Sequence, residues 1–186
     1  MESELIVHAR NGDHAAYETL VREHEAAVFR LAYLILSDAD AAQDVAQEAF
    51  VRAFQQLDRF DPARPFRPWV LRITRNLARN HRRSLGRYVA ALQRAGWAAP
   101  RSSASAEAEQ LGAQEAQALW DAVRRLSRQE QEVIYLRYML ELSVNETAEV
   151  LDVPAGTVKS RLSRALRRLK GVVLHEFPLL VEGRLP

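Results

Sequence analysis

Apolar residues recur at helical spacing along almost the whole chain, and this is the feature that most limits the fold. The first long run consists of Tyr17, Leu20, Val21, Val28, Leu31, Leu34 and Ile35. Such spacing places apolar side chains on one face of a helix. The 7 Gly and 7 Pro residues cluster at the boundaries between runs, where they do not interrupt a helix. The pattern therefore predicts an all-α protein of two helical domains joined by a flexible linker.

A stretch of small and polar residues interrupts this pattern from Gly96 to Ala106. It contains Pro100 and several Ser and Ala residues, a composition typical of a flexible linker. We therefore predict a first domain over residues 1–95, a linker over 96–112 and a second domain over 113–186. Within the second domain we expect a helix-turn-helix at 143–170 and a C-terminal tail at 171–186.

Helix boundaries in the first domain follow from single residues. Asp13 is placed to cap the first long helix, and the polar break Ser37–Asp40 separates it from a helix that ends near Leu57. Pro62 and Pro65 predict a loop over Asp58–Arg67, and a basic helix from about Pro68 to Ser84 follows it. In the second domain, Ser127 with Glu130 and Ser143 with Glu146 have the spacing of a capping box, which predicts two helix starts.

Charge is distributed in blocks, although the net charge is only +2. Residues 1–61 hold 12 acidic and 5 basic side chains, and residues 62–106 hold 10 Arg and no acid. Residues 107–152 hold 10 acids and 4 bases, and residues 153–186 hold 7 bases and 2 acids. Two basic blocks within helical segments indicate a polyanionic partner.

Several classes of protein are disfavoured. The chain has no Cys, so disulfides and thiolate metal sites are excluded, which fits a cytoplasmic protein. The 5 His residues show no metal-ligand spacing, and no phosphate-binding glycine loop or nucleophile motif is present. No stretch is long and apolar enough for membrane insertion. We therefore expect no enzyme activity, no cofactor and no metal site.

The strongest local signal lies between Ser143 and Leu169. A short helix ends at Leu151, and Pro154 suits the first turn of the next helix, where its missing N–H is harmless. On that helix Val158, Leu162, Ala165, Leu166 and Leu169 share one side. The candidate DNA-contacting residues on the other side are Thr157, Lys159, Ser160, Arg161, Ser163 and Arg164. A short turn followed by a basic helix with small hydroxyls is the geometry that enters a major groove.

Four segments together resemble one family. Val153–Ala165 resembles the promoter-reading helix of bacterial sigma factors, and Leu126–Val133 resembles the start of the same domain. Ala42–Phe50 resembles the family's docking signature for the polymerase clamp, and Phe66–Asn80 resembles its minus-ten recognition helix. The chain has no room for the extra middle domain of housekeeping sigma factors, so the resemblance is to the extracytoplasmic-function (ECF) subfamily.

The resemblance implies roles for the first domain. It assigns docking on the clamp of the largest core subunit to Asp44, Gln47 and Glu48. On the basic helix, Trp69, Val70, Ile73 and Leu77 are expected inside the domain. The candidate minus-ten contacts are Arg72, Arg75, Asn76, Arg79, Asn80 and Arg83. In the family, this helix and the loop before it capture a base flipped out of the non-template strand.

The function implied is therefore that of a sigma factor, which binds core RNA polymerase, directs it to specific promoters and promotes DNA opening. The expected partners are core RNA polymerase, promoter DNA and an anti-sigma factor. The alternative is a helix-turn-helix regulator that acts without replacing sigma. Such a regulator would explain residues 143–169 but not the docking signature or the first basic helix.

Overall fold

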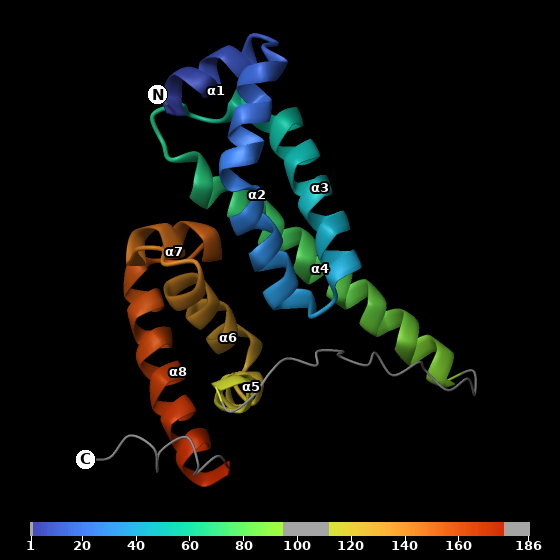
Figure 1. Ribbon diagram of the computed structural model, residues 1–186, viewed down its shortest axis with the longest axis vertical. Helices are drawn as coiled ribbons and strands as arrows, with labels where there is room; N and C mark the ends of the chain where they lie inside the picture. The colour runs from blue at the N-terminus through green and yellow to red at the C-terminus, as the bar shows by residue number, and fades with distance from the viewer. Residues whose placement is uncertain (1, 95–111, 177–186) are drawn as a thin grey trace. The chain divides into compact units, whose positions relative to one another are not determined.

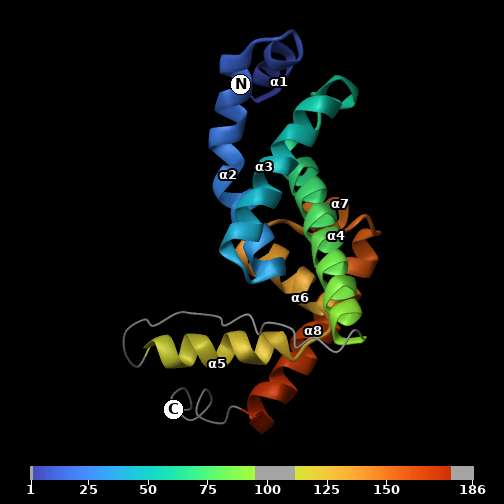
Figure 2. The same cartoon turned by 90° about the vertical axis from the view of Figure 1, so that its right-hand side faces the viewer.

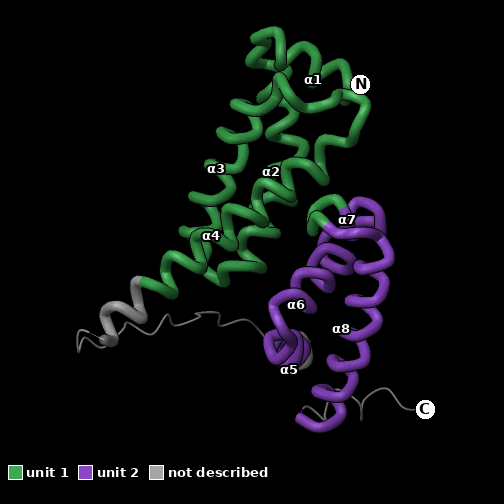
Figure 3. Tube along the Cα trace, turned by 180° about the vertical axis from the view of Figure 1, so that it is seen from behind, with its two compact units in different colours: residues 1–104, 149–152 green, residues 105–148, 153–186 purple. Residues whose placement is uncertain are grey.

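The structure is a computed structural model that describes residues 2–94 and 112–176. Every regular element within these residues is helical, which confirms the all-α prediction. The chain divides into two compact units (Figure 3): residues 1–104 with 149–152, and residues 105–148 with 153–186. The predicted linker at 96–112 lies outside the described residues except for Gly112, which begins a helix rather than ending the linker. No helix among the described residues is long and apolar enough to cross a membrane.

The first unit is built on four α-helices, labelled in Figure 1, and one short 3₁₀ helix. They are α1 (Glu2–Arg10), α2 (His14–Leu36), α3 (Ala39–Gln56), η1 (Leu57–Arg59) and α4 (Phe66–Arg94). Helices α2, α3 and α4 pack on one another (Figure 2), while α1 packs on α2 and η1. Their shared core includes Leu20, Leu31, Ala49, Phe66 and Leu71, which are all at most 1% exposed.

Two aspartates begin helices in the first unit. The Asp13 carboxylate accepts the Ala16 N–H at 3.1 Å, which confirms it as the cap of α2. The Asp38 carboxylate accepts the Ala41 N–H at 2.8 Å, so Asp38, a residue of the predicted polar break, caps α3. A side-chain oxygen on the residue before a helix satisfies a backbone donor that the first helical turn leaves free. Ser37, which separates α2 from α3, has a left-handed φ of 56°.

The loop before α4 is shorter than predicted. Helix α4 begins at Phe66 instead of Pro68, because the side chain of Phe66 is fully buried in the core of the unit. Pro68 lies in the first turn of α4, where a missing N–H costs no helical hydrogen bond. The apolar stripe of α3 also favours a core position for Phe54, but this side chain is 41% exposed near the end of the helix.

The second unit contains α5 (Gly112–Arg124), α6 (Arg128–Ile134), the π-helical turn η2 (Tyr135–Met139), the start of α7 (Val144–Leu151) and α8 (Ala155–Glu176), while residues 149–152 group with the first unit. Helix α8 packs on α5 and α6. Both capping boxes are confirmed: the Glu130 carboxylate accepts the Ser127 N–H at 3.0 Å, and the Glu146 carboxylate accepts the Ser143 N–H at 2.7 Å. The π-helical turn was not foreseen, because neither caps nor apolar spacing mark such a turn.

Helix α8 differs from expectation in two respects. Val158 and Ala165 are fully buried, but Leu166 is 39% exposed, because the neighbouring helices cover a narrower stripe than the apolar pattern suggested. The helix also continues to Glu176, so residues 171–176 of the expected tail are helical. The rest of the tail, residues 177–186, lies outside the described residues.

Candidate nucleic-acid interface

The polar face of α3 is exposed to solvent. Asp44, Gln47 and Glu48 are all exposed, while the opposite face of the helix packs into the core of the unit. The Glu48 carboxylate accepts a hydrogen bond from the Arg52 Nε at 2.6 Å, one turn further along. The three candidate docking residues therefore form one polar surface on a helix whose position is set by buried neighbours.

The outer face of α4 carries most of the candidate minus-ten residues. Asn76, Asn80 and Arg83 are exposed, and Arg72 and Arg79 are half-buried. These positions recur every three or four residues, so they share one side of the helix.

Arg75 is the exception, and its expected place on the outer face is wrong. It is only 6% exposed, because it stands one turn after Leu71 and one turn before Ala78, which are both fully buried. The inner stripe of α4 consists of Val70, Leu71, Thr74 and Ala78. The expected inner residues Ile73 and Leu77 lie at its edge and are half-buried. Arg82 faces α2, where its guanidinium donates to the Ile35 carbonyl oxygen at 3.2 Å.

The candidate residues of α8 cluster in its first three turns. Lys159, Ser160, Ser163 and Arg164 are exposed, and Thr157 and Arg161 are half-buried. The turn that precedes them places Asp152 in a left-handed conformation with φ of 58°, and the Pro154 carbonyl accepts the Thr157 N–H at 2.9 Å. Pro154 therefore precedes the helix instead of lying within its first turn.

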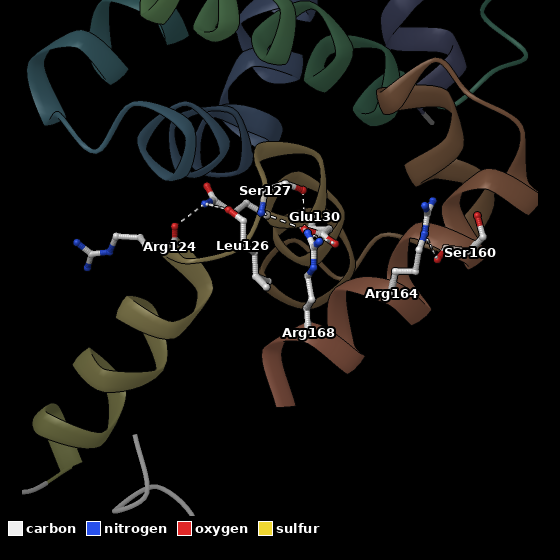
Figure 4. A network of polar contacts seen from close by, with 8 residues as sticks. Arg124, Leu126, Ser127, Glu130, Ser160, Arg164 and Arg168 are labelled. Carbon is white, nitrogen blue, oxygen red and sulfur yellow. Dashed lines mark hydrogen bonds and ion pairs between the residues drawn. The ribbon is translucent and has the colours of Figure 1, made fainter. Parts of the chain in front are cut away.

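Figure 4 shows a polar network that joins α8 to the start of α6. Arg168 donates to both oxygens of Glu130, at 3.1 and 3.4 Å, and the same carboxylate accepts the Ser127 hydroxyl at 2.6 Å. On α8 itself, the Arg164 Nε donates to the Ser160 carbonyl oxygen at 3.3 Å. The partnership of Glu130 with Arg168 was not predicted, since the capping box by itself accounted for the acid.

Beside this network lies a cleft of about 630 Å³ between α6 and α8. Its lining includes four arginines from one side of α8, namely Arg161, Arg164, Arg167 and Arg168. Only one of them, Arg168, is neutralised by Glu130 in the network above. The cleft thus extends the positive surface of α8 to Arg167 and Arg168, which are not among the candidate DNA contacts. The spacing of the arginines along the helix could have indicated this larger surface.

The environment of Glu130 stabilises its charged form. Burial by itself raises the pKa of this carboxyl group, but hydrogen bonds from Ser127 and the nearby Arg168 guanidinium outweigh burial and lower the pKa below its usual value. A pKa lowered by folding means that the carboxylate adds stability above the ordinary pKa of about 4.3, and that this stability is lost as pH falls through the lower folded value.

Replacing Glu130 by Gln is therefore expected to destabilise the second unit by about 1–2 kcal/mol at neutral pH. The difference from the wild type should shrink as the pH falls below the ordinary pKa of about 4.3 and through the lower folded pKa, where the native carboxyl group becomes protonated too. Chemical denaturation of both proteins across this range measures it. A difference that stayed constant with pH would show that the charge of Glu130 is not what stabilises the unit.

The fold also brings Glu2 of α1 close to Glu23 and His24 of α2, and all three are potential metal ligands. Ligand atoms of Glu2, Glu23 and His24 lie within 4.8 Å of one another. Glu2 already contacts the His24 Nε2 at 3.1 Å and accepts the Phe66 N–H at 3.2 Å. These two contacts of Glu2 account for the short distances between the three side chains, so the cluster is explained by helix packing without a metal ion.

Comparison with known proteins agrees with the two interfaces. Residues 20–88 match the family Sigma-70 region 2, and residues 116–169 match Sigma-70 region 4. The chain is 30% identical to the ECF RNA polymerase sigma factor SigW of Bacillus subtilis, over 91% of this chain and 95% of that protein.

Two solved structures are also similar. One is CnrH in complex with the cytosolic domain of CnrY, with a TM-score of 0.71 and 26% identity over 94% of this chain and 98% of that one. The other is the sigma factor RpoE of Bartonella quintana with the anti-sigma factor NepR, also with a TM-score of 0.71, at 25% identity over 86% of this chain and 98% of that one.

A regulator with only a helix-turn-helix would not match region 2, so that alternative is set aside. Both sigma regions occur in order on one chain, and their helices expose the polar and basic residues described above. The chain therefore belongs to the ECF sigma factors, the transcription initiation factors that bind core RNA polymerase and direct it to promoter DNA.

Proposed function

We propose that this sigma factor divides promoter recognition between its units. Residues 1–95 bind the polymerase clamp through Asp44, Gln47 and Glu48 and read the minus-ten element through α4. Residues 113–186 read the minus-thirty-five element through α8. The observation that carries this division is that each unit presents one helix whose exposed side is basic and polar while its other side is buried.

On α4, two kinds of side chain support a role in holding an opened strand. Arg83 is exposed, and the half-buried Arg72 and Arg79 lie on the same side of the helix. Arginines in such a row neutralise phosphates, which positions a strand without reading its sequence. Asn76 and Asn80 stand beside them, and an exposed amide is suited to hydrogen-bond a base edge.

On α8, the supporting feature is the arrangement of short and long polar side chains. Ser160 and Ser163 are exposed next to Lys159 and Arg164, so the helix can approach a groove closely and still extend cations to it. Arg reads guanine through two hydrogen bonds, and Ser contacts bases or phosphates. The arginine-lined cleft continues this positive surface toward α6.

We further propose that an anti-sigma factor controls the protein and that it acts in the cytoplasm, without enzymatic activity of its own. The similar structure of RpoE was solved with its anti-sigma factor NepR, which supports a partner of this kind. The cytoplasmic location follows from the partners, because bacterial RNA polymerase and the chromosome lie there.

Asn80→Ala tests the proposed role of α4. The variant is expected to leave duplex binding by the second unit unchanged but to impair formation of the open complex by holoenzyme. Permanganate reactivity of unpaired thymines reports opening on a normal duplex and on a template with a premelted bubble. Flipping a base costs a few kcal/mol of stacking, so the bubble should relieve the defect.

The double variant Arg79→Ala, Arg83→Ala extends the test to the phosphate contacts. Wild-type reactivity on both templates, for Asn80→Ala and for this pair, would show that α4 does not handle the open strand. A defect that persists on the bubble would assign the residues to a step other than melting.

A further inference from the structure

The loop between η1 and α4 is held at both ends by α1, a helix that precedes the residues matched to the sigma family. At the C-terminal end of α1, the Arg10 guanidinium donates from Nε to the Leu57 carbonyl at 3.2 Å and from Nη2 to the Phe60 carbonyl, where the loop begins. At the N-terminal end of α1, the Glu2 carboxylate accepts the Phe66 N–H at 3.2 Å, where the loop ends. In Figure 1 the segment between α3 and α4 passes beside α1.

The contact of Glu2 is itself supported by α2. The second oxygen of its carboxylate lies 3.1 Å from the Nε2 of His24, which is only 8% exposed. The His24 ring stacks on the Phe66 ring, with centroids 5.4 Å apart and planes at 29°. Since Phe66 contributes the first N–H of α4, Glu2 supplies an acceptor and a negative charge where a helix start favours both.

Packing holds the two ends of the loop as well. Phe60 is 4% exposed, and its ring lies 5.9 Å from that of Phe66 and 4.5 Å from that of Trp69. On α1, Ile6 and Ala9 are buried against the rest of the unit. Both ends of the loop are thus buried and hydrogen-bonded to one helix.

The tip of the loop is different. Asp61, Ala63, Arg64 and Pro65 are exposed. The Asp61 side chain accepts the Ala63 N–H at 3.0 Å, and the Asp61 carbonyl accepts the Arg64 N–H at 3.0 Å. Local contacts therefore turn the tip, and α1 holds both ends of the loop that carries it. Holding a binding loop in place before its ligand arrives removes the entropic cost of ordering it during binding.

We propose that Arg10 and Glu2 are positioning residues for capture of the unpaired minus-ten base. They touch no nucleic acid. They act by holding the ends of the loop, so that its tip and α4 are both in position to contact the base. This inference rests on the proposed function, in which that loop and α4 handle the non-template strand. Arg10 matters more than Glu2, because one planar guanidinium serves two carbonyls at once.

The test uses holoenzyme assembled with the full-length chain and a single-stranded oligonucleotide that carries the non-template minus-ten sequence of a promoter it transcribes. Arg10→Ala is expected to weaken binding of this strand roughly tenfold, and to reduce discrimination between the native strand and one that lacks the flipped base. Arg10→Lys should have an intermediate effect, because an ammonium group lacks the planar pair of donors. Arg22→Ala, which removes an exposed arginine of α2 paired with Glu18, is the matched control and should bind like the wild type.

Thermal unfolding and affinity for core polymerase show whether a variant is folded, and Glu2→Gln replaces Arg10→Ala if the latter is not. Wild-type binding and wild-type base discrimination by a folded Arg10→Ala or Glu2→Gln holoenzyme would overturn the inference. A second variant, Asp61→Gly with Arg64→Ala, alters the tip directly. If the tip variant also binds like the wild type, the proposed role of the loop has failed; if only the tip variant is impaired, positioning by α1 has failed.

Discussion

Replacing Asp44 and Glu48 together by Lys is expected to weaken the binding of core RNA polymerase by at least about 100-fold, which corresponds to about 3 kcal/mol. Both side chains are exposed one turn apart on α3, so the change reverses two charges on one docking surface. It removes attractive contacts and introduces like charges if the clamp presents basic groups there. The fold should persist, because neither residue is buried and, within residues 2–94 and 112–176, the ion pair lost is the exposed Glu48–Arg52 contact.

Co-purification and equilibrium binding with core polymerase measure this effect, with circular dichroism as the check on folding. The matched control is Glu18→Lys with Glu25→Lys, which reverses two exposed charges on α2 of the same unit. This control also loses one exposed ion pair, Glu18–Arg22, so its change in surface charge is equivalent. Equal affinity of the Asp44, Glu48 variant and the control would place the docking surface elsewhere.

Removing the Arg161 side chain should cost roughly 1–3 kcal/mol of promoter binding, if it reads a base in the minus-thirty-five element. Arg161 is half-buried on α8 and lines the cleft with Arg164. A residue in a bidentate base contact discriminates against other bases at one position. Arg161→Ala is therefore expected to relax the preference at a single position of the element.

Binding of holoenzyme to a set of promoters with each minus-thirty-five position varied in turn tests this result. Lys170→Ala is the control, because Lys170 is an exposed cation further along the same helix. It should cause a small loss that is similar on all sequences. If Arg161→Ala also loses affinity equally on all sequences, Arg161 is a phosphate contact and another residue of α8 reads the base.

Much of the helical organisation could be predicted, because caps and apolar spacing are local properties of the chain. Asp13 and Ser143 were recognised as helix starts from their side chains, and both make the expected backbone contacts. The exposed polar face of α3 also followed from periodicity. Errors occurred where burial depends on neighbouring helices: Arg75 is buried, whereas Phe54 and Leu166 are exposed.

By itself, the sequence determined the all-α class and the segments that present polar and basic helix faces, since helical periodicity places every third or fourth residue on one side. Only the tertiary structure decided which parts of those faces remain open, and which distant residues meet. Arg10 with Phe60, Glu2 with Phe66 and Arg168 with Glu130 are separated by 38 residues or more. No local pattern predicts such pairs, because they form only when helices from different parts of the chain pack and bring a donor to an acceptor that the fold has already placed.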